Sequence, residues 1–365
     1  MPAKLYNLPL KYNDTWRNFD SITYDMRVTG EIILGKSVLE LEANTAQYVN
    51  SKFSVGVSNG TDALIITLEH LKQRFPGRTR VITTPLSYLA STSSIVLARL
   101  DPVFCDIDIS LNLNPSLLAN LIDDKTLAVL FVHYAGNPTN ILDVANICKA
   151  SGVPLIEDCA QSFGSSIDSL YSGAHGLAGC VSFHPLKLLS CLGDGGIIIT
   201  SDFSLNAYAR LARNHGHSTR DDIEFWSRNC RLDTLQASIV LSQMKWFTNE
   251  LSVRRRQYLI YKSILGNRFL PYVHAAAAPS HNWMVILVSN RKDLIEFLAK
   301  HEVETKVHYP KLITELYPFS SNEVSQTTIR IAHVLKQQIL SIPIGSHLLD
   351  STIERIALLI CSFYE

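Results

Sequence analysis

Residues 180–200 read Cys-Val-Ser-Phe-His-Pro-Leu-Lys-Leu-Leu-Ser-Cys-Leu-Gly-Asp-Gly-Gly-Ile-Ile-Ile-Thr. They set one lysine, Lys187, between an apolar strand and a glycine turn. An amine held against apolar neighbours loses hydration of its charged form, so its pKa falls and it becomes a nucleophile able to form a Schiff base with an aldehyde. Taken alone, such a segment more often encodes a solvated lysine near a hairpin. The rest of the chain has to decide between the two.

Short apolar runs on both sides of this segment alternate with helical patterns and turn signals. This order of strand, helix, strand, helix predicts an α/β domain with a mostly parallel sheet between helices. Ligands of open α/β sheets bind beyond the carboxyl ends of the strands, and several of these runs end in residues with reactive side chains. The predicted strands are residues 81–84, 102–105, 127–132, 154–157, 180–183 and 197–200.

The pattern of apolar and charged residues changes in the second half of the sequence. A helix carrying Leu235, Ile239 and Met244 is followed by Arg254-Arg255-Arg256, which we interpret as a domain boundary. Beyond it, a strand at 283–288 and a helix at 293–301 indicate a smaller α+β domain. We therefore predict a large α/β domain over residues 1–250 and a small domain over residues 251–365, as the length of 365 residues favours.

Composition limits the classes of function. The chain has 33 basic and 33 acidic residues, so no global charge favours binding to nucleic acid or to an anionic membrane. Its 7 cysteines are scattered without Cys-x-x-Cys or metal-like spacing, which predicts reduced thiols and no metal site. Neither a signal peptide nor an apolar run of membrane-spanning length is evident, so we expect a cytoplasmic enzyme.

One segment predicts a phosphate site. Asn59-Gly60-Thr61-Asp62 leads into an apolar helical pattern, which places Gly60 and Thr61 at a helix N-terminus. Free amides and the helix dipole favour an anion there, and the glycine permits close approach. A simple capped helix explains the same residues about equally well.

Two further strand ends carry candidate groups. Glu157 and Asp158 follow a buried strand, and a protonated heterocycle nitrogen would satisfy Asp158. Tyr88 closes another strand and could cover one face of a planar ring, while Ser182 could add a hydroxyl to the phosphate site. Each feature alone has a commoner explanation as a helix-start charge or ordinary packing.

Taken together and in this order, these motifs resemble the pyridoxal-phosphate sugar aminotransferases of the DegT/StrS type, within the aspartate-aminotransferase-like fold type I superfamily. The resemblance covers nearly the whole chain. It rests on residues 33–35, 59–64, 84–88, 133–138, 157–161, 182–187, 214–216, 229–233 and 308–310.

The resemblance implies roles for the matching residues. Lys187 would carry the cofactor as a Schiff base and then move a proton between substrate and cofactor. Asp158 would hold the pyridine nitrogen, Gln161 the ring hydroxyl, and Tyr88 would stack on the ring. The phosphate would be held by Gly60, Thr61, Ser182 and, from the neighbouring subunit, Asn229.

The resemblance also implies the reaction and the partners. An amino donor, typically glutamate, converts pyridoxal 5'-phosphate (PLP) to its amine form (PMP), and a keto-deoxy sugar on a nucleoside diphosphate accepts the nitrogen. A homodimer with shared active sites is implied by Asn229. Candidate substrate residues are Arg231, His308, Tyr309 and Lys311, and the motifs lean toward amination at C4 of a 4-keto-6-deoxyhexose.

Three positions depart from the family pattern. Leu177 stands where aspartate is common, Val181 where phenylalanine is usual, and Ser227 where glycine is frequent. None of them removes a catalytic group, although Ser227 bears on the loop that presents Asn229.

Three alternatives remain open at this stage. A dehydratase of the same family would have histidine in place of Lys187, and an iron-sulfur relative would need clustered cysteines. A protein that binds the cofactor or a sugar nucleotide only as a sensor would need no intact lysine and aspartate.

Overall fold

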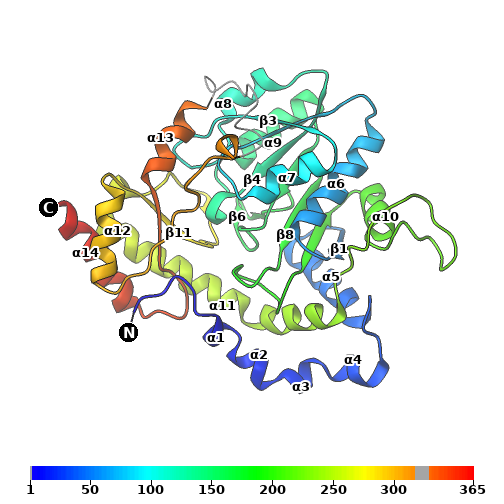
Figure 1. Cartoon of the computed structure of the whole chain (residues 1–365), viewed down its shortest axis with the longest axis horizontal. Coiled ribbons are helices and arrows are strands. Elements are labelled where there is room, and N and C mark those ends of the chain that lie inside the picture. The colour runs from blue at the N-terminus through cyan, green and yellow to red at the C-terminus, as the bar shows by residue number, and fades with distance from the viewer. Residues whose placement is uncertain (1, 317–328) are drawn as a thin grey trace.

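The computed structural model describes residues 2–316 and 329–365, and a seven-stranded sheet lies at its centre (Figure 1). The strand order is β1-β9-β8-β5-β4-β2-β3, and β9 alone runs antiparallel to its neighbours in this sheet. The predicted α/β fold with a mostly parallel sheet is therefore confirmed. The strands are β1 (Phe53–Val57), β2 (Arg80–Thr83), β3 (Asp101–Phe104), β4 (Thr126–Val132), β5 (Leu155–Asp158), β8 (Ala178–Ser182) and β9 (Gly196–Thr200).

Six of these strands overlap the predicted runs, and β1 was not predicted. Its sequence, Phe-Ser-Val-Gly-Val, is interrupted by Ser54 and Gly56, which weakens the apolar signal. Both interruptions have structural causes. The Ser54 hydroxyl donates to the Glu42 carbonyl, and a Cβ on Gly56 would lie 3.1 Å from the Leu232 side chain.

Helices cover both faces of the sheet. One face packs against α6 (Gly60–Arg74), α7 (Leu89–Leu97) and α10 (Phe203–Ala212). The other packs against α5 (Lys36–Val49), α9 (Ile141–Ser151) and the first half of α11 (Thr234–Leu265). Successive side chains of a strand point to opposite faces, so Ala128 and Leu130 of β4 contact the first group while Val129 and Phe131 contact the second.

A second core lies at the C-terminal end of the chain. It contains a two-stranded sheet of β11 (Met284–Leu287) and β12 (Ile339–Ile342), packed against the second half of α11. The helices of this region are α12 (Arg291–Lys300), α13 (Arg330–Gln338) and α14 (Asp350–Tyr364). The predicted limit at residues 250/251 falls inside α11, which runs on through Arg254–Arg256. The N-terminal half of α11 packs against the seven-stranded sheet through Phe247. Its C-terminal half packs into the second core through Tyr261.

The N-terminal segment lies along α11, at the bottom of Figure 1. It forms four short helices, α1 (Leu8–Lys11), α2 (Asn13–Arg17), α3 (Phe19–Ile22) and α4 (Tyr24–Thr29). Ahead of them, Ala3 pairs with Val303 and belongs to the second core. The N-terminus therefore links both parts of the molecule.

Shorter elements complete the described part of the chain. They are α8 (Pro115–Leu118), the small sheet of β6 (Ser166–Ile167), β7 (Leu170–Tyr171) and β10 (Ala277–Ala278), and four 3₁₀ turns at Ala119–Leu121, Tyr134–Gly136, Asn267–Phe269 and Ile313–Glu315. Across the described residues, none of the helices combines the length and apolar character needed to cross a bilayer.

A buried ion network ties α5 to β1 and α10. Glu42 accepts hydrogen bonds from Gly56 N, Arg213 and Arg210, and its side chain is 5% exposed. A charge removed from water needs a close counter-charge, and here the carboxylate meets two guanidinium groups.

We predict that Glu42→Gln lowers the free energy of unfolding by about 3 kcal/mol, because it leaves the Arg213 guanidinium buried without a counter-charge. Urea denaturation measures the change. Asp20→Asn is the matched control: its pair with Arg27 is exposed, at 95% and 58% of the two side chains, so little change is expected. Equal losses in the two variants would contradict the assignment.

Candidate active site

The two carboxylates at the end of β5 point to opposite faces of the sheet. Asp158 has the parity of Ile156, which contacts the α6 and α7 side, and Glu157 has the parity of Leu155 on the α9 side. Asp158 accepts a hydrogen bond from the Ser91 hydroxyl of α7 at 2.7 Å and one from Ala160 N at 3.0 Å. Its carboxylate is thereby fixed at the carboxyl edge of the sheet.

Glu157 forms a separate brace with β4 and the loop before β8. It accepts four hydrogen bonds, from His133 Nε2 at 2.8 Å and from Gly173 N, His175 N and Gly176 N. Burial opposes ionisation of Glu157. The His133 hydrogen bond and charge, together with His175 and the backbone amide, outweigh burial and hold the pKa of Glu157 below its ordinary value.

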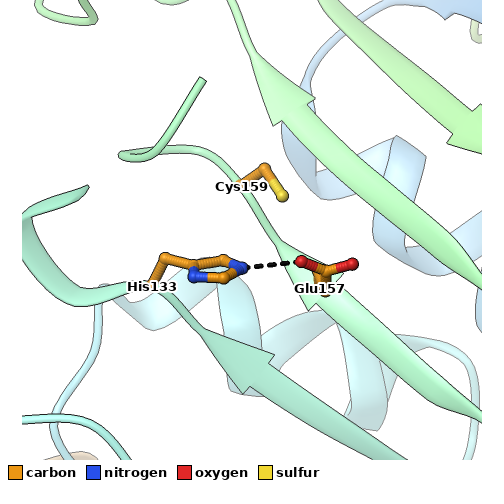
Figure 2. A group of neighbouring side chains, drawn as sticks. All are labelled: His133, Glu157 and Cys159. Atoms are coloured by element: carbon orange, nitrogen blue, oxygen red, sulfur yellow. Dashed lines mark hydrogen bonds and ion pairs between the residues drawn. The ribbon is translucent and has the colours of Figure 1, made fainter. Parts of the chain in front are cut away.

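Figure 2 shows His133, Glu157 and Cys159 converging as three potential metal ligands. Both Glu157 oxygens already accept two hydrogen bonds each, so no lone pair faces a cation. Burial raises the pKa of the Cys159 thiol well above its ordinary value, which keeps the thiol protonated. The arrangement suits a hydrogen-bonded brace behind Asp158 better than a metal centre.

Lys187 lies in an apolar environment near Asp158. Burial lowers its pKa to about 8, and the Asp158 charge opposes that shift. The Lys187 amine sits 5.8 Å from the centroid of the Trp283 ring. A large fraction of this amine is therefore neutral near pH 8, as a nucleophile or proton acceptor requires.

An aromatic wall flanks the lysine. Trp283 stacks on His308 at 3.9 Å between ring centroids, and Tyr309 stands edge-on to Trp283. Tyr88 lies 5.9 Å from Tyr309 and leaves 58% of its surface exposed. A planar ring could stack on the free face of Tyr88.

His308 is held as a neutral ring. Its Nδ1 pairs with the Ser341 hydroxyl at 2.8 Å, and burial, with the nearby Lys306 and Lys187 charges, lowers its pKa to about 3. Its role toward an anion is therefore limited to hydrogen bonding through Nε2, without a positive charge.

The predicted phosphate site is assembled at the start of α6. The Asn59 side chain caps this helix by accepting from Asp62 N at 2.8 Å. A Cβ on Gly60 would lie 2.9 Å from Ser182 Cβ, so β8 and the helix start approach as closely as glycine allows. Ser182 accepts from His184 N and keeps its own proton to donate. Gly60, Thr61 and Ser182 thus form a cup that fits a phosphate group.

Gln161 is oriented by the backbone. Its side-chain oxygen accepts from Ala135 N at 2.6 Å, which leaves its NH₂ group as a donor. Asp158 ends β5 and Gln161 follows it by three residues, so the strand end offers one carboxylate and one amide donor.

The remaining predicted residues lie farther along the edge. Asn229 and Arg231 lie on a segment beside β1, because Arg231 forms an isolated β-bridge with Val57. The Arg231 guanidinium donates hydrogen bonds to Asn229 and Asn214. Asn229 is exposed. Lys311 is also exposed.

Sequence reasoning missed two residues of this site. Ser91 lies one helical turn beyond Tyr88, but it opens a run of four hydroxyl residues, Ser91 to Ser94, so no local signal distinguished it. Trp283 directly precedes β11 and lies more than ninety positions after Lys187 in the sequence, so no local pattern links the two residues.

Comparison with known proteins identifies a protein family that matches nearly the whole chain. The model of the DegT/DnrJ/EryC1/StrS aminotransferase family matches residues 20–360. UDP-2-acetamido-2-deoxy-3-oxo-D-glucuronate aminotransferase of Pseudomonas aeruginosa is 32% identical over 328 residues, covering 89% of this chain and 90% of that protein. A pleiotropic regulatory protein of Geobacillus stearothermophilus is 32% identical over 353 residues, covering 93% and 94%.

Structural similarity is equally extensive. The crystal structure of DesV from S. venezuelae in complex with a ketimine intermediate matches with a TM-score of 0.94 and 26% identity. The match covers 100% of this chain and 99% of DesV.

We predict that Glu157→Gln destabilises the protein at pH 7 by about 2 kcal/mol, because a neutral amide replaces the acceptor of four hydrogen bonds. The folded-state pKa of Glu157 is depressed, so its contribution is present above about pH 4.5 and is lost as pH falls below that value. The variant should therefore lose less stability than the wild type between pH 7 and pH 4.

Urea denaturation at both pH values measures this difference. Glu354→Gln, at an exposed position of α14, is the matched control and should follow the wild type. If the wild type and Glu157→Gln lost equal stability between pH 7 and pH 4, the proposed role of the Glu157 hydrogen bonds would be refuted.

Proposed function

The chain belongs to the DegT/DnrJ/EryC1/StrS aminotransferase family, and from that premise we propose that it transfers the amino group of L-glutamate to a nucleotide-linked keto-deoxy sugar. The resemblance found in the motifs is thereby confirmed, and the chain is a PLP-dependent aminotransferase. The observation that carries the proposal is the desolvated Lys187 amine beside the fixed Asp158 carboxylate.

The described residues fit the cofactor. Gly60, Thr61 and Ser182 meet where a Cβ on Gly60 would clash with Ser182, and we assign these three residues to the phosphate. Asp158 presents a carboxylate for the pyridine nitrogen, and Gln161 an amide for the ring hydroxyl. Tyr88 is assigned to the ring face.

The cofactor supplies an electron sink that stabilises negative charge at the substrate carbon. Lys187 Nζ takes the proton from the donor's α-carbon and later delivers one to the sugar carbon that receives nitrogen. Asp158 favours protonation of the heterocycle facing it, because a buried carboxylate needs a positive partner. The Trp283 ring, 5.8 Å from the amine, contributes to the burial that lowers the pKa of Lys187 and favours its neutral, basic form.

The substrate side is proposed at the four residues that the motifs assigned to it. Arg231 and Lys311 supply positive charge for the diphosphate, and His308 and Tyr309 supply hydrogen bonds to the sugar. The motifs favour a 4-keto-6-deoxyhexose, whereas the Pseudomonas relative acts on a 3-oxo sugar. Both keto positions therefore enter the test.

We further propose a cytoplasmic homodimer with shared active sites. Asn229 is exposed on a strip that borders the start of α6, where it could reach the phosphate cup of a second copy. Trp226 on the same strip is 91% exposed, which is unusual for a tryptophan that meets only water.

A non-catalytic sensor is the second candidate, favoured by the regulatory name of the Geobacillus relative. Lys187 and Asp158 are both in place here, which a sensor does not require. The same lysine argues against the dehydratase alternative.

We predict that the PLP-loaded protein shows a visible absorption band that L-glutamate bleaches. Lys187→Ala should lack the lysine-bound band, because it removes the amine that the Asp158 charge acts on. Lys262→Ala, an exposed lysine of α11, should behave as the wild type. After bleaching, addition of a nucleotide-linked 3-keto or 4-keto sugar should restore the band with whichever is the acceptor. A band that no amino donor changes would favour the sensor.

We predict that Asp158→Asn lowers the pKa of Lys187 below about 8, because the carboxylate charge is the group that raises it. In the cofactor-free protein, the rate of PLP attachment rises with pH as the amine deprotonates, so its midpoint should shift to lower pH in the variant. Ser91→Ala retains the charge and should keep the wild-type midpoint. A midpoint that stays or rises in Asp158→Asn would contradict the electrostatic coupling.

A further inference from the structure

The N-terminal segment reaches the loop that carries Lys187. This loop, residues 183–195, joins β8 to β9, and we call it the lysine loop. Lys11, the last residue of α1, donates hydrogen bonds from its amine to the Pro185 carbonyl at 3.1 Å and to the Lys187 carbonyl. A side chain that is 176 positions away in the sequence therefore holds the main chain at the nucleophilic residue itself.

The next residue of the segment holds the same loop at a second place. The Tyr12 hydroxyl donates to the Cys191 carbonyl at 2.6 Å and pairs with the Ser190 hydroxyl at 2.8 Å. Lys11 and Tyr12 are adjacent, so the end of α1 contacts the lysine loop both at Lys187 and three to four residues beyond it.

The backbone that presents Lys11 is itself anchored elsewhere. Leu5 N donates to the Glu304 carboxylate at 2.9 Å, which ties the segment to the second core. The Asn7 side chain caps α1 by accepting a hydrogen bond from Leu10 N at 3.2 Å. Lys11 therefore extends from a fixed backbone and can restrain the loop that it contacts.

The main chain of Lys187 is restrained from two sides. Its N–H donates to the His184 carbonyl at 2.8 Å, and its carbonyl accepts from Lys11. The direction of a side chain depends on the main chain from which it extends, so these two bonds help to aim the Lys187 amine at the site beside Asp158. Such aim matters for rate, because a displacement of about 1 Å at a reacting group can cost about 100-fold.

The hold is available in both protonation states of Lys11. Burial, followed by the Arg254 charge, lowers the pKa of Lys11 to about 7, while Glu250 and Cys191 raise it. An ammonium group has three N–H donors and a neutral amine has two, so either form can serve the two carbonyls. The hydrogen bonds therefore persist near pH 8, where Lys187 loses its proton.

We propose that Lys11 is a positioning residue for the catalytic lysine. By holding the Pro185 and Lys187 carbonyls, it keeps the Lys187 amine aimed at the site beside Asp158. This inference rests on the proposed function and adds to it a residue from the N-terminal segment. Lys11 acts through the main chain, and we assign it no contact with the cofactor or the sugar.

The first test is the rate at which PLP attaches to the cofactor-free protein at pH 8, followed by the growth of the lysine-bound band. Lys11→Met removes both hydrogen bonds and should slow attachment about 10-fold or more. Lys11→Arg should restore most of the rate, because a guanidinium has several N–H donors and a cavity of about 570 Å³ borders Lys11.

Lys245→Met is the matched control for the loss of a lysine. Lys245 lies on α11, lines the same cavity and is exposed. Its substitution removes the same charge from the same surroundings and leaves the two carbonyls with Lys11. The Lys245→Met protein should therefore attach PLP at the wild-type rate.

The second test is the bleaching of the PLP-loaded protein by L-glutamate. Lys11→Met should lower the maximal rate about 10-fold or more and leave the half-saturating glutamate concentration unchanged, because the amine is misaimed while glutamate binds as before. Glu42→Gln loses stability away from the lysine loop and should keep the wild-type maximal rate. It separates general destabilisation from loss of positioning.

Two results would overturn the proposal. One is a wild-type attachment rate in Lys11→Met. The other is a bleaching defect confined to the half-saturating glutamate concentration, since Lys11 would then act on the substrate.

If circular dichroism shows that Lys11→Met does not fold, Lys11→Gln decides. Glutamine is one atom shorter than lysine, so it should fall short of the carbonyls and slow attachment in the same way. If glutamate fails to bleach the wild type, the proposed function fails, whereas the attachment rate still tests the role of Lys11.

Discussion

The alternation of side chains along β5 governs the site. Successive residues of a strand face opposite sides, so Glu157 and Asp158 cannot serve the same pocket. Glu157 turns toward His133 and fixes the loop before β8, whereas Asp158 turns toward α7 and receives the Ser91 hydroxyl. One carboxylate thus holds the strand end rigidly, and the other is free to act on a ligand.

Lys187 depends on this arrangement for its reactivity. Burial near Trp283 removes hydration from the ammonium form and lowers the pKa of Lys187. The Asp158 charge favours the ammonium form and opposes this shift, so that the pKa is about 8. The lysine loop is also held from behind by Lys11, whose amine donates to main-chain carbonyls on it. The Lys187 amine therefore lies near a carboxylate and an aromatic ring, and the Lys11 amine holds the loop that carries it.

The motifs predicted those parts of the site that lie near one another in sequence or at strand ends. The glycine and threonine that open α6, and the carboxylate that ends β5, follow from local rules about helix termini and parallel sheets. Ser91, Trp283 and Lys11 were not predicted, because their roles depend on packing between distant segments. His308 was predicted as a substrate residue, and only its enclosure by Trp283 and Ser341 indicates that the ring is neutral.

The sequence by itself determined the alternating α/β order, and it placed the candidate phosphate residues and the candidate nucleophilic lysine, because each lies in a run of contiguous residues. The tertiary structure alone decided which β5 carboxylate faces the site, how strongly Lys187 is desolvated, and that α1 reaches the lysine loop. Burial and electric field are sums over neighbours, and those neighbours come from segments as far apart as Lys11, Lys187 and Trp283. No local pattern can encode such sums, since they exist only once the chain has packed.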